Sequence, residues 1–307
     1  MDGAVNLKQQ KKPVLPRMKK YAGFYVLFLP VLAFLVVFHY LPMIGIYYSF
    51  TKYTIIKDPV WVGLANFERL FAMPNFWNAF QNTLELSVVK LLLTTTFSVV
   101  LSLLLNEMRN VVYKRTLQTL VYLPYFISWV ALAGIFLDVL SMDGVVNQLI
   151  TALGLEPVYF LGDERIFPYT MVVTDVWKNF GWNAIVYLAA ITSVDPSLFE
   201  AAYLDGAGRF RQVLHVTLPT IMPIIMLTTI LSIGNVLRAG FDQIFNLYSP
   251  LVYSTGDIID TFIYRLGLED FHFSPSAAVG LFNSIVNFFL VVIVNKISDK
   301  VSETSLW

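Results

Sequence analysis

Residues 91–105 read LLLTTTFSVVLSLLL, a stretch without a single charged side chain. It belongs to a longer apolar segment, 83–105, and an α-helix needs about 20 largely apolar residues to cross a bilayer. Polar and apolar residues do not alternate along it, as they would in a transmembrane β-strand, so we expect a helix. The same test selects six segments along the chain: 22–49, 83–105, 118–140, 168–192, 218–237 and 276–295.

The composition supports a membrane-embedded chain. Of its 307 residues 57% are apolar and only 14% are charged, against about 25% charged in soluble domains, and the mean hydropathy is +0.65. The 21 Lys and Arg residues balance 21 Asp and Glu residues, so there is no basic surplus for nucleic acid. Cysteine is absent, which excludes disulfides, thiolate metal sites and cysteine nucleophiles. We predict an all-α integral membrane protein with six transmembrane helices.

The distribution of Lys and Arg predicts the orientation, because positively charged loops stay on the cytoplasmic side. With the N-terminus inside, the inner segments hold thirteen Lys and Arg residues and the outer loops hold six. We therefore expect both termini to be cytoplasmic, with a basic segment over 1–21 and the transmembrane domain over 22–307. The first span is too long for a signal peptide and should remain attached. The long outer loops are 50–82, 141–167 and 238–275.

The inner loop 195–219 has the local signals of two short helices. Asp195 is a natural N-cap with Pro196 at the first helical position, and Gly206 supplies the left-handed residue that ends a helix. Small residues next to Glu200 leave a surface that another protein can approach closely. An ordinary surface helix without a partner would have the same features, so these signals alone leave the role of the loop open.

The spacing inside this loop is more specific. Glu200-Ala201-Ala202 is followed after three residues by Gly206, and after nine more by Val216-x-Leu218-Pro219. This pattern resembles the EAA loop of ABC-importer permeases, with Val216 where isoleucine is commoner. The resemblance implies a type I ABC-importer permease fold whose cytoplasmic coupling helix docks into an ATP-hydrolysing subunit. The implied coupling residues are Glu200, Ala201, Ala202, Asp205, Gly206, Leu218 and Pro219.

Further segments resemble the sugar-permease family. VGLANF at 62–67 and NTL at 82–84 are similar to that family's first outer loop and second span, while LPYFISWV at 123–130 and DIIDTFIYR at 257–265 resemble its polysaccharide and complex-oligosaccharide members. The resemblance implies uptake of oligosaccharides or polysaccharide fragments across a bacterial cytoplasmic membrane. The implied partners are a second, different permease, two ATPase subunits, an extracytoplasmic solute-binding protein and membrane lipid.

The chain lacks the motifs of an enzyme. No Gly-Lys pair occurs, so it has no P-loop for nucleotide phosphates; ATP and Mg²⁺ are expected on the partner ATPase, and no cofactor on this chain. His39, His215 and His272 lie far apart in the sequence, without a second nearby ligand, so we expect no metal site. Glu269 and Asp270 beside His272 are more simply solvated loop residues. We expect no catalytic residues.

Polar residues within spans are costly in hydrocarbon and usually mark a pathway or a partner contact. Asp175 and Lys178 are three residues apart and can neutralise each other on one helical face. An aromatic ring can stack on a sugar, an amide can bond hydroxyls, and an arginine can hold a carboxylate. The alternative role, for these residues and for Lys90, is packing between helices. The candidate path residues are Trp182, Asn183, Asn235, Arg238 and Gln243.

Two other functions are compatible with a polytopic chain. An ion-coupled secondary transporter would place coupling ions on Asp175 and Lys178, but it has no need of the EAA spacing in 195–219. An ABC permease for a non-sugar solute would share that loop, but the sugar-type motif at 62–67 argues against it. A membrane enzyme or receptor is disfavoured because no catalytic constellation and no soluble domain are found.

Overall fold

The computed structural model describes residues 21–234 and 236–302. The basic stretch 1–20 and the candidate path residue Asn235 lie outside the described residues. The elements of the first half are α2 (Ala22–Leu35), η1 (Val36–Tyr40), η2 (Leu41–Phe50), β1 (Thr51–Thr54), β2 (Lys57–Trp61), α3 (Ala65–Phe71), α4 (Pro74–Glu107), α5 (Val111–Tyr122), η3 (Leu123–Phe126), α6 (Trp129–Val139) and α7 (Val145–Ala152).

The second half is also helical. Its elements are α8 (Phe167–Thr192), α9 (Pro196–Leu204), α10 (Arg209–Gln212), η4 (Val213–Thr217), α11 (Leu218–Ile233), η5 (Val236–Arg238), α12 (Phe241–Leu247), η6 (Pro250–Val252), α13 (Tyr253–Gly256), α14 (Ile259–Tyr264), η7 (Arg265–Glu269) and α15 (Phe273–Ser302).

The candidate membrane spans agree with the six predicted segments. Within the described residues four helical stretches are long and apolar enough to cross a membrane, and the number is six if each of two bent pairs counts as one span. The unbroken spans are Ala22–Phe50, Pro74–Glu107, Arg209–Ile233 and Phe273–Lys296. The bent pairs are Val111–Phe126 with Trp129–Val139, at 103°, and Phe167–Thr192 with Pro196–Leu204, at 68°.

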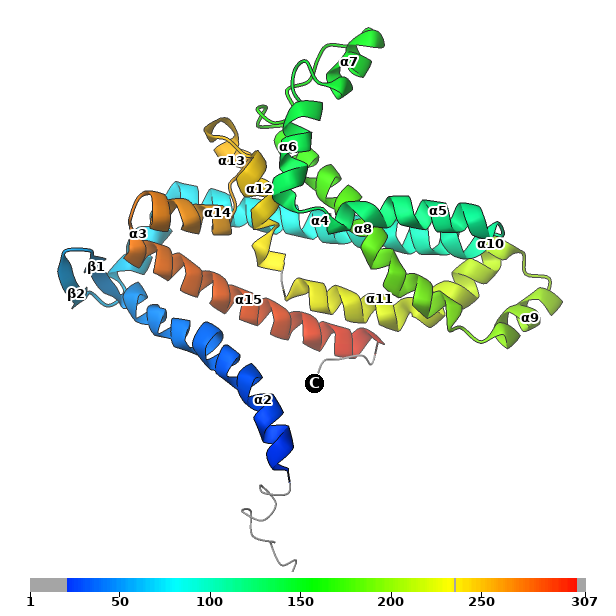
Figure 1. Cartoon of the computed structure of the whole chain (residues 1–307), viewed down its shortest axis with the longest axis horizontal. Coiled ribbons are helices and arrows are strands. Elements are labelled where there is room, and N and C mark those ends of the chain that lie inside the picture. The colour runs from blue at the N-terminus through cyan, green and yellow to red at the C-terminus, as the bar shows by residue number, and fades with distance from the viewer. Residues whose placement is uncertain (1–20, 235, 303–307) are drawn as a thin grey trace, which may run out of the picture.

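Helices α4 and α8 lie side by side along much of the molecule (Figure 1). Leu101 and Leu105 of α4 pack with Ala184 of α8 in a buried cluster. Gly181 of α8 allows α5 to approach closely, because a Cβ atom there would lie 2.2 Å from the carbonyl oxygen of Val121. Burial of apolar side chains between these helices, together with this close backbone packing, builds the centre of the bundle.

The predicted third span, 118–140, is not one continuous helix. Pro124 is the second residue of the 3₁₀ turn η3, and the side chain of Ser128 caps α6 by accepting a hydrogen bond from the backbone N–H of Ala131 at 3.2 Å. The chain therefore turns sharply between α5 and α6, and α6 with α7 forms an arm that projects from the bundle (Figure 1).

The predicted fifth span, 218–237, also differs. It begins earlier, because α10, η4 and α11 form one stretch, and it ends at Ile233. Asn287 of α15 donates to the carbonyl oxygen of Gly234 at 2.9 Å, which satisfies one of the backbone groups left at the helix end. The chain then passes through the short turn η5 to α12.

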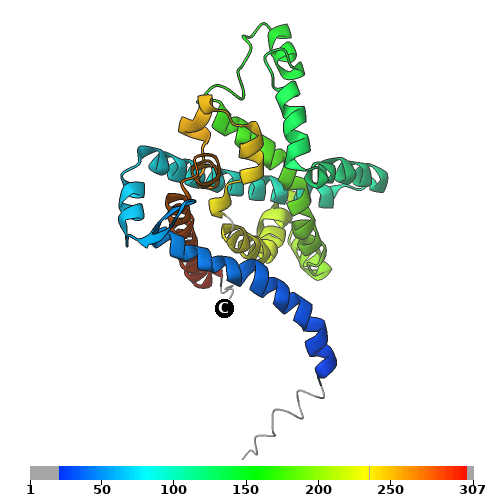
Figure 2. The same cartoon turned by 60° about the vertical axis from the view of Figure 1, so that its left-hand side comes forward.

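The N-terminal part of the first span stands apart from the bundle, whereas its last part, η2, packs against α15. Its helix α2 has no buried residue and leads away from the remaining helices in both views (Figures 1 and 2). After it, β1 and β2 form an antiparallel hairpin in which Thr51 pairs with Trp61, a feature that a purely helical prediction omits. Asn66 fastens the hairpin through hydrogen bonds to the carbonyl oxygens of Ser49 and Thr51, both at 2.9 Å. The hairpin and α3 lie at the end of the bundle opposite α9 and α10 (Figure 1).

Candidate functional site

The short helix α9 is built as its sequence predicts. The Asp195 carboxylate accepts a hydrogen bond from the backbone N–H of Ser197 at 2.9 Å, and this bond lowers the pKa of Asp195. Gly206 adopts a φ of +77°, which ends the helix. The second predicted helix of the loop, α10, does not stand alone, since it continues through η4 into α11. The inner loop therefore contains one separate short helix, α9, and is followed directly by a span.

The outer surface of α9 is available to a partner. Tyr203 and Leu204, neighbours on α9, are 74% and 84% exposed. Together with Glu200 they line a hollow of about 670 Å³, whose lining also includes Gly208 and Arg209. A charged group next to exposed apolar anchors is the mixture expected of a protein docking surface.

The inner surface of α9 is anchored to the bundle. Phe199 packs with Leu218, at the start of α11, against a buried cluster formed by Ile191, Val194 and Ile221. The cluster joins the end of α8 to the beginning of α11, so a displacement of α9 would be passed to both helices. Of the implied coupling residues, Glu200 thus faces a hollow, whereas Leu218 and Pro219 belong to the first turn of α11.

A second concave site lies towards the other end of the molecule. It is a cavity of about 910 Å³ between η5, α12, α14, η7 and α15, with Trp129 of α6 at its edge. Three charged side chains line it, Arg238, Asp242 and Asp260. Burial raises the pKa of Asp260 to about 6, with the positive charge of Arg238 acting in the opposite direction. The aromatic lining residues are Trp129, Phe241, Tyr264 and Phe273.

The predicted path residues do not all meet in this cavity. Arg238 lines it, whereas Gln243 is fully buried behind the cavity wall. Trp182 lies elsewhere and stacks on Tyr125, with ring centroids 4.5 Å apart and planes within 2°, so one face of its indole is already covered. Asn183 is exposed on α8 and is not among the residues that line the cavity.

The two lysines within spans bind backbone carbonyls at helix breaks. Nζ of Lys178 donates to the three carbonyl oxygens of the α5–α6 break, at 3.2 Å (Pro124), 2.9 Å (Tyr125) and 2.6 Å (Ile127). Asp175 acts on it electrostatically, as the prediction expects, but the two side chains form no direct ion pair. The break exposes carbonyls that hydrocarbon cannot solvate, and a buried ammonium group satisfies them.

Lys90 acts in the same way at the break between α11 and α12. Its Nζ donates to the carbonyl oxygen of Ala239 at 2.8 Å and to the side-chain oxygen of Gln243 at 2.6 Å. The side-chain nitrogen of Gln243 in turn donates to Met171 and Thr174 of α8, at 2.8 and 2.7 Å. Lys90 and Gln243 therefore link three elements of the bundle.

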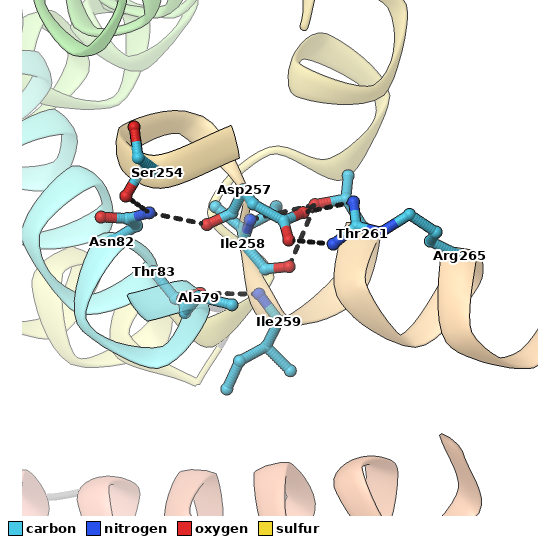
Figure 3. A network of polar contacts seen from close by, with 9 residues as sticks. All are labelled: Ala79, Asn82, Thr83, Ser254, Asp257, Ile258, Ile259, Thr261 and Arg265. Atoms are coloured by element: carbon cyan, nitrogen blue, oxygen red, sulfur yellow. Dashed lines mark hydrogen bonds and ion pairs between the residues drawn. The ribbon is translucent and has the colours of Figure 1, made fainter. Parts of the chain in front are cut away.

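A network of polar contacts fixes the segment that leads to the cavity (Figure 3). The carboxylate of Asp257 is paired with the guanidinium of Arg265 and accepts a hydrogen bond from the hydroxyl of Thr261 at 2.8 Å. Asn82 of α4 donates to the carbonyl oxygen of Asp257 at 3.0 Å, and Thr83 accepts from the backbone N–H of Ile259 at 2.8 Å. The motif at 257–265 thus holds α14 against α4.

Sequence reasoning missed part of the cavity lining. Asp260 was not among the candidates, although it lies inside the quoted motif 257–265. The usable signal was the three-residue spacing of Asp257 and Asp260 on either side of the start of the short helix α14, which begins at Ile259. The spacing alone does not show which carboxylate is buried and which lines the cavity. Asp257 is buried because it pairs with Arg265 and lies against α4, and this leaves Asp260 to line the cavity.

Several spans, a protruding short helix at one end and, towards the other, a cavity with charged and aromatic lining residues define a membrane transport subunit. Comparison with known families then places the chain: residues 98–303 match the family described as "Binding-protein-dependent transport system inner membrane component", and the chain belongs to this family. The resemblance inferred from the inner loop and the sugar-type motifs is confirmed.

Similar proteins match this chain over nearly its full length. The chain is 38% identical over 311 residues to the polygalacturonan/rhamnogalacturonan transport system permease protein YteP of Bacillus subtilis, with 100% of this chain and 97% of that protein covered. It is 39% identical over 294 residues to protein LplB of the same organism, covering 94% and 92% of the two chains.

A solved structure supports the fold. A chain of a bacterial ABC transporter involved in the import of the acidic polysaccharide alginate superposes with a TM-score of 0.89 and 37% identity, over 95% of this chain and 100% of that chain. A chain of the alginate transporter in complex with an alginate pentasaccharide-bound periplasmic protein gives a TM-score of 0.90 and 36% identity, over 96% and 100% of the two chains. The protein described here is therefore a multi-pass transport permease with the type I ABC-importer fold.

Proposed function

We propose that this permease imports oligosaccharide fragments of polysaccharides, acidic ones in particular, in an ATP-driven transporter. The other components are a second permease, two ATPase subunits and an extracytoplasmic solute-binding protein that delivers the glycan. ATP and Mg²⁺ bind to the ATPase subunits, which lie against α9 in the cytoplasm. Both termini of the chain are on that same side.

One observation carries this proposal: the two concave sites lie at opposite ends of the span that contains α11. Phe199 of α9 and Leu218 of α11 share a buried cluster at one end. From there α11 runs to Gly234, and the next turn, η5, places Arg238 in the cavity. Work done on α9 by an ATPase can therefore reach the cavity wall through α11, which is the transmission that a coupled importer needs.

The chemistry of the cavity suits a sugar. Aromatic faces are apolar platforms on which the carbon–hydrogen face of a sugar ring can lie. The guanidinium of Arg238 can hold a carboxylate by two parallel hydrogen bonds, which suits a uronate unit. Two similar transport proteins are named for polygalacturonan/rhamnogalacturonan and for alginate, and these names support an acidic glycan as the solute.

The first span supports a second permease as partner. Helix α2 has no buried residue and stands apart from the bundle (Figure 2). Lipid tails are as apolar as the side chains of such a helix, so its association with another helix is driven by close packing rather than by the hydrophobic effect. An apolar helix without neighbours in its own chain can therefore pack against a helix of another subunit. We assign α2 to the contact with the second permease and with lipid.

The ion-coupled alternative loses its proposed site. It requires Lys178 and Asp175 to be free for a coupling ion, but the ammonium group of Lys178 already donates to three backbone carbonyls. A lysine occupied in this way cannot also exchange protons or ions without breaking the α5–α6 turn.

The proposal is tested by affinity purification of the tagged chain from native membranes, with wild type compared with Glu200→Lys. The wild type should bring down an ATPase subunit and a second permease, and the variant should lose the ATPase but keep the second permease. Glu156→Lys is the matched control, since it makes the same change of charge at an exposed position after α7. Equal recovery of the ATPase with Glu200→Lys and the wild type would contradict the role of α9.

A further inference from the structure

The wall of the cavity contains a backbone turn that the chain would not adopt unaided. Ala239 and Gly240 lie between η5 and α12 with φ values of +45° and +84°. A left-handed conformation is ordinary for glycine but unfavourable for alanine by about 1–2 kcal/mol. Such a conformation persists only where the surrounding structure holds it in place.

The holding group is the ammonium of Lys90. Lys90 is 6% exposed and lies on α4, and its Nζ donates to the carbonyl oxygen of Ala239 itself, at 2.8 Å. Its second hydrogen bond, to Gln243 at 2.6 Å, extends to α8 through the amide nitrogen of Gln243. The turn is thus tied directly to α4, and through Lys90 and Gln243 to α8.

The residues on either side of the turn are those that line the cavity. Arg238, Gly240 and Asp242 all face it, whereas Lys90 does not line it. Because the turn separates the two charged residues, its geometry sets where the positive and the negative group stand relative to each other.

We propose that Lys90 is the positioning residue of the glycan site: it holds the Ala239–Gly240 turn, which in turn aims Arg238 and Asp242 into the cavity. This inference rests on the proposed function of the cavity. It assigns Lys90 neither to substrate contact nor to ion coupling, since the ammonium group is directed at the backbone of the wall.

The same geometry predicts how replacing Lys90 should affect transport. Loss of hydrogen bonds from a buried charged donor makes the competent turn less populated, and apparent affinity falls in proportion to the competent fraction. Loss of one such hydrogen bond is expected to lower the apparent affinity about tenfold. We therefore expect Lys90→Met to raise the KM for glycan uptake about tenfold while the maximal rate and ATPase recovery stay near wild type. Lys90→Arg keeps a buried donor, so its KM should lie between those of the wild type and Lys90→Met.

A labelling experiment reads the turn directly, without transport. The chain contains no cysteine, so Ile244→Cys, at a fully buried position on α12, gives a single reactive thiol. In the assembled complex its labelling by a charged thiol reagent should become about tenfold faster when Lys90→Met is added. Ala278→Cys, fully buried on α15, is the control probe and should change by less than twofold.

A second variant covers the case in which Lys90→Met fails to assemble. A Cβ atom on Gly240 would lie 3.2 Å from Nζ of Lys90 and would sit on a residue with a φ of +84°, so Gly240→Ala should disturb the same contact from the other side. Gly134→Ala, on α6 with nothing within 4 Å of the added Cβ, is its control.

The outcomes separate this inference from the proposed function. Faster labelling at Ile244→Cys together with a raised KM supports both. Faster labelling with no ATP-driven glycan uptake even in the wild type retains the role of Lys90 in the turn but overturns the glycan site. Labelling that is unchanged within twofold in both Lys90→Met and Gly240→Ala overturns the inference.

Discussion

The buried ion pair of Asp257 and Arg265 should be the strongest single attachment of the segment next to the cavity. The side chains are 4% and 19% exposed, and the guanidinium also lies over the ring of Tyr253, 4.2 Å from its centroid. Replacing Asp257 with asparagine leaves a largely buried guanidinium without its counter-charge. Removing one partner of a buried pair costs about 3–5 kcal/mol.

The expected effect of Asp257→Asn follows from these contacts. We take the lower end, about 3 kcal/mol, because Arg265 keeps some access to water. Since about 1.4 kcal/mol corresponds to a factor of ten, local opening of α13 and α14 should become about a hundredfold more frequent. Hydrogen exchange of the backbone amides between 253 and 265, measured on the assembled complex in lipid nanodiscs, reports that opening directly.

Two further variants make the test specific. Asp270→Asn makes the same chemical change at an exposed position after η7, and it should leave exchange in α13 and α14 unchanged. Arg265→Gln combined with Asp257→Asn should recover part of the protection, because the uncompensated buried charge is then gone. If Asp257→Asn alone exchanges within threefold of the wild type, the pair does not hold this segment and the reasoning is refuted.

Four other predictions concern the cavity and the helices of the bundle. The pKa of Asp260 is raised to about 6 from an ordinary value near 4, so between these pH values the folded protein keeps a proton that the unfolded chain releases. The free energy of unfolding should therefore fall as pH rises from about 4 to 6. Asp260→Asn should remove this dependence, as measured by thermal unfolding followed by tryptophan fluorescence. The same protonation should favour a uronate at Arg238, so uptake of an acidic glycan should increase as pH falls through about 6, and an unchanged profile in Asp260→Asn would contradict this. Leu105→Ala, at a fully buried position, should cost about 3 kcal/mol of stability by leaving a cavity beside α8; a loss below 1 kcal/mol in denaturant titration would show that the site collapses. Lys178→Met should leave three carbonyls of the α5–α6 break unsatisfied and lower the unfolding temperature, which a variant as stable as wild type would disprove.

The spans and the inner loop were predictable because their signals are local. Asp195 and Gly206 begin and end α9 as expected, since capping depends on residues within one or two turns. The length and hydropathy of 83–105 likewise identify a span without reference to any other segment.

The helix breaks and the cavity were not predictable in this way, because they depend on distant partners. Pro124 and Ser128 are visible signals for a break, but the 103° turn between α5 and α6 also needs Lys178, which is contributed by α8. Lys90 and Ala239 are separated by 149 residues. No pattern along the chain shows that this lysine meets a carbonyl rather than an ion or a sugar.

The central claim is that this chain carries acidic oligosaccharides at the expense of ATP hydrolysed by a subunit docked on α9. The most direct test is uptake of a labelled oligogalacturonate into proteoliposomes that contain the complete transporter, with its solute-binding protein added outside and ATP enclosed inside. The account predicts uptake that requires both the binding protein and ATP, and that is lost in Glu200→Lys. Uptake that proceeds without nucleotide, or at an unchanged rate in Glu200→Lys, would contradict it.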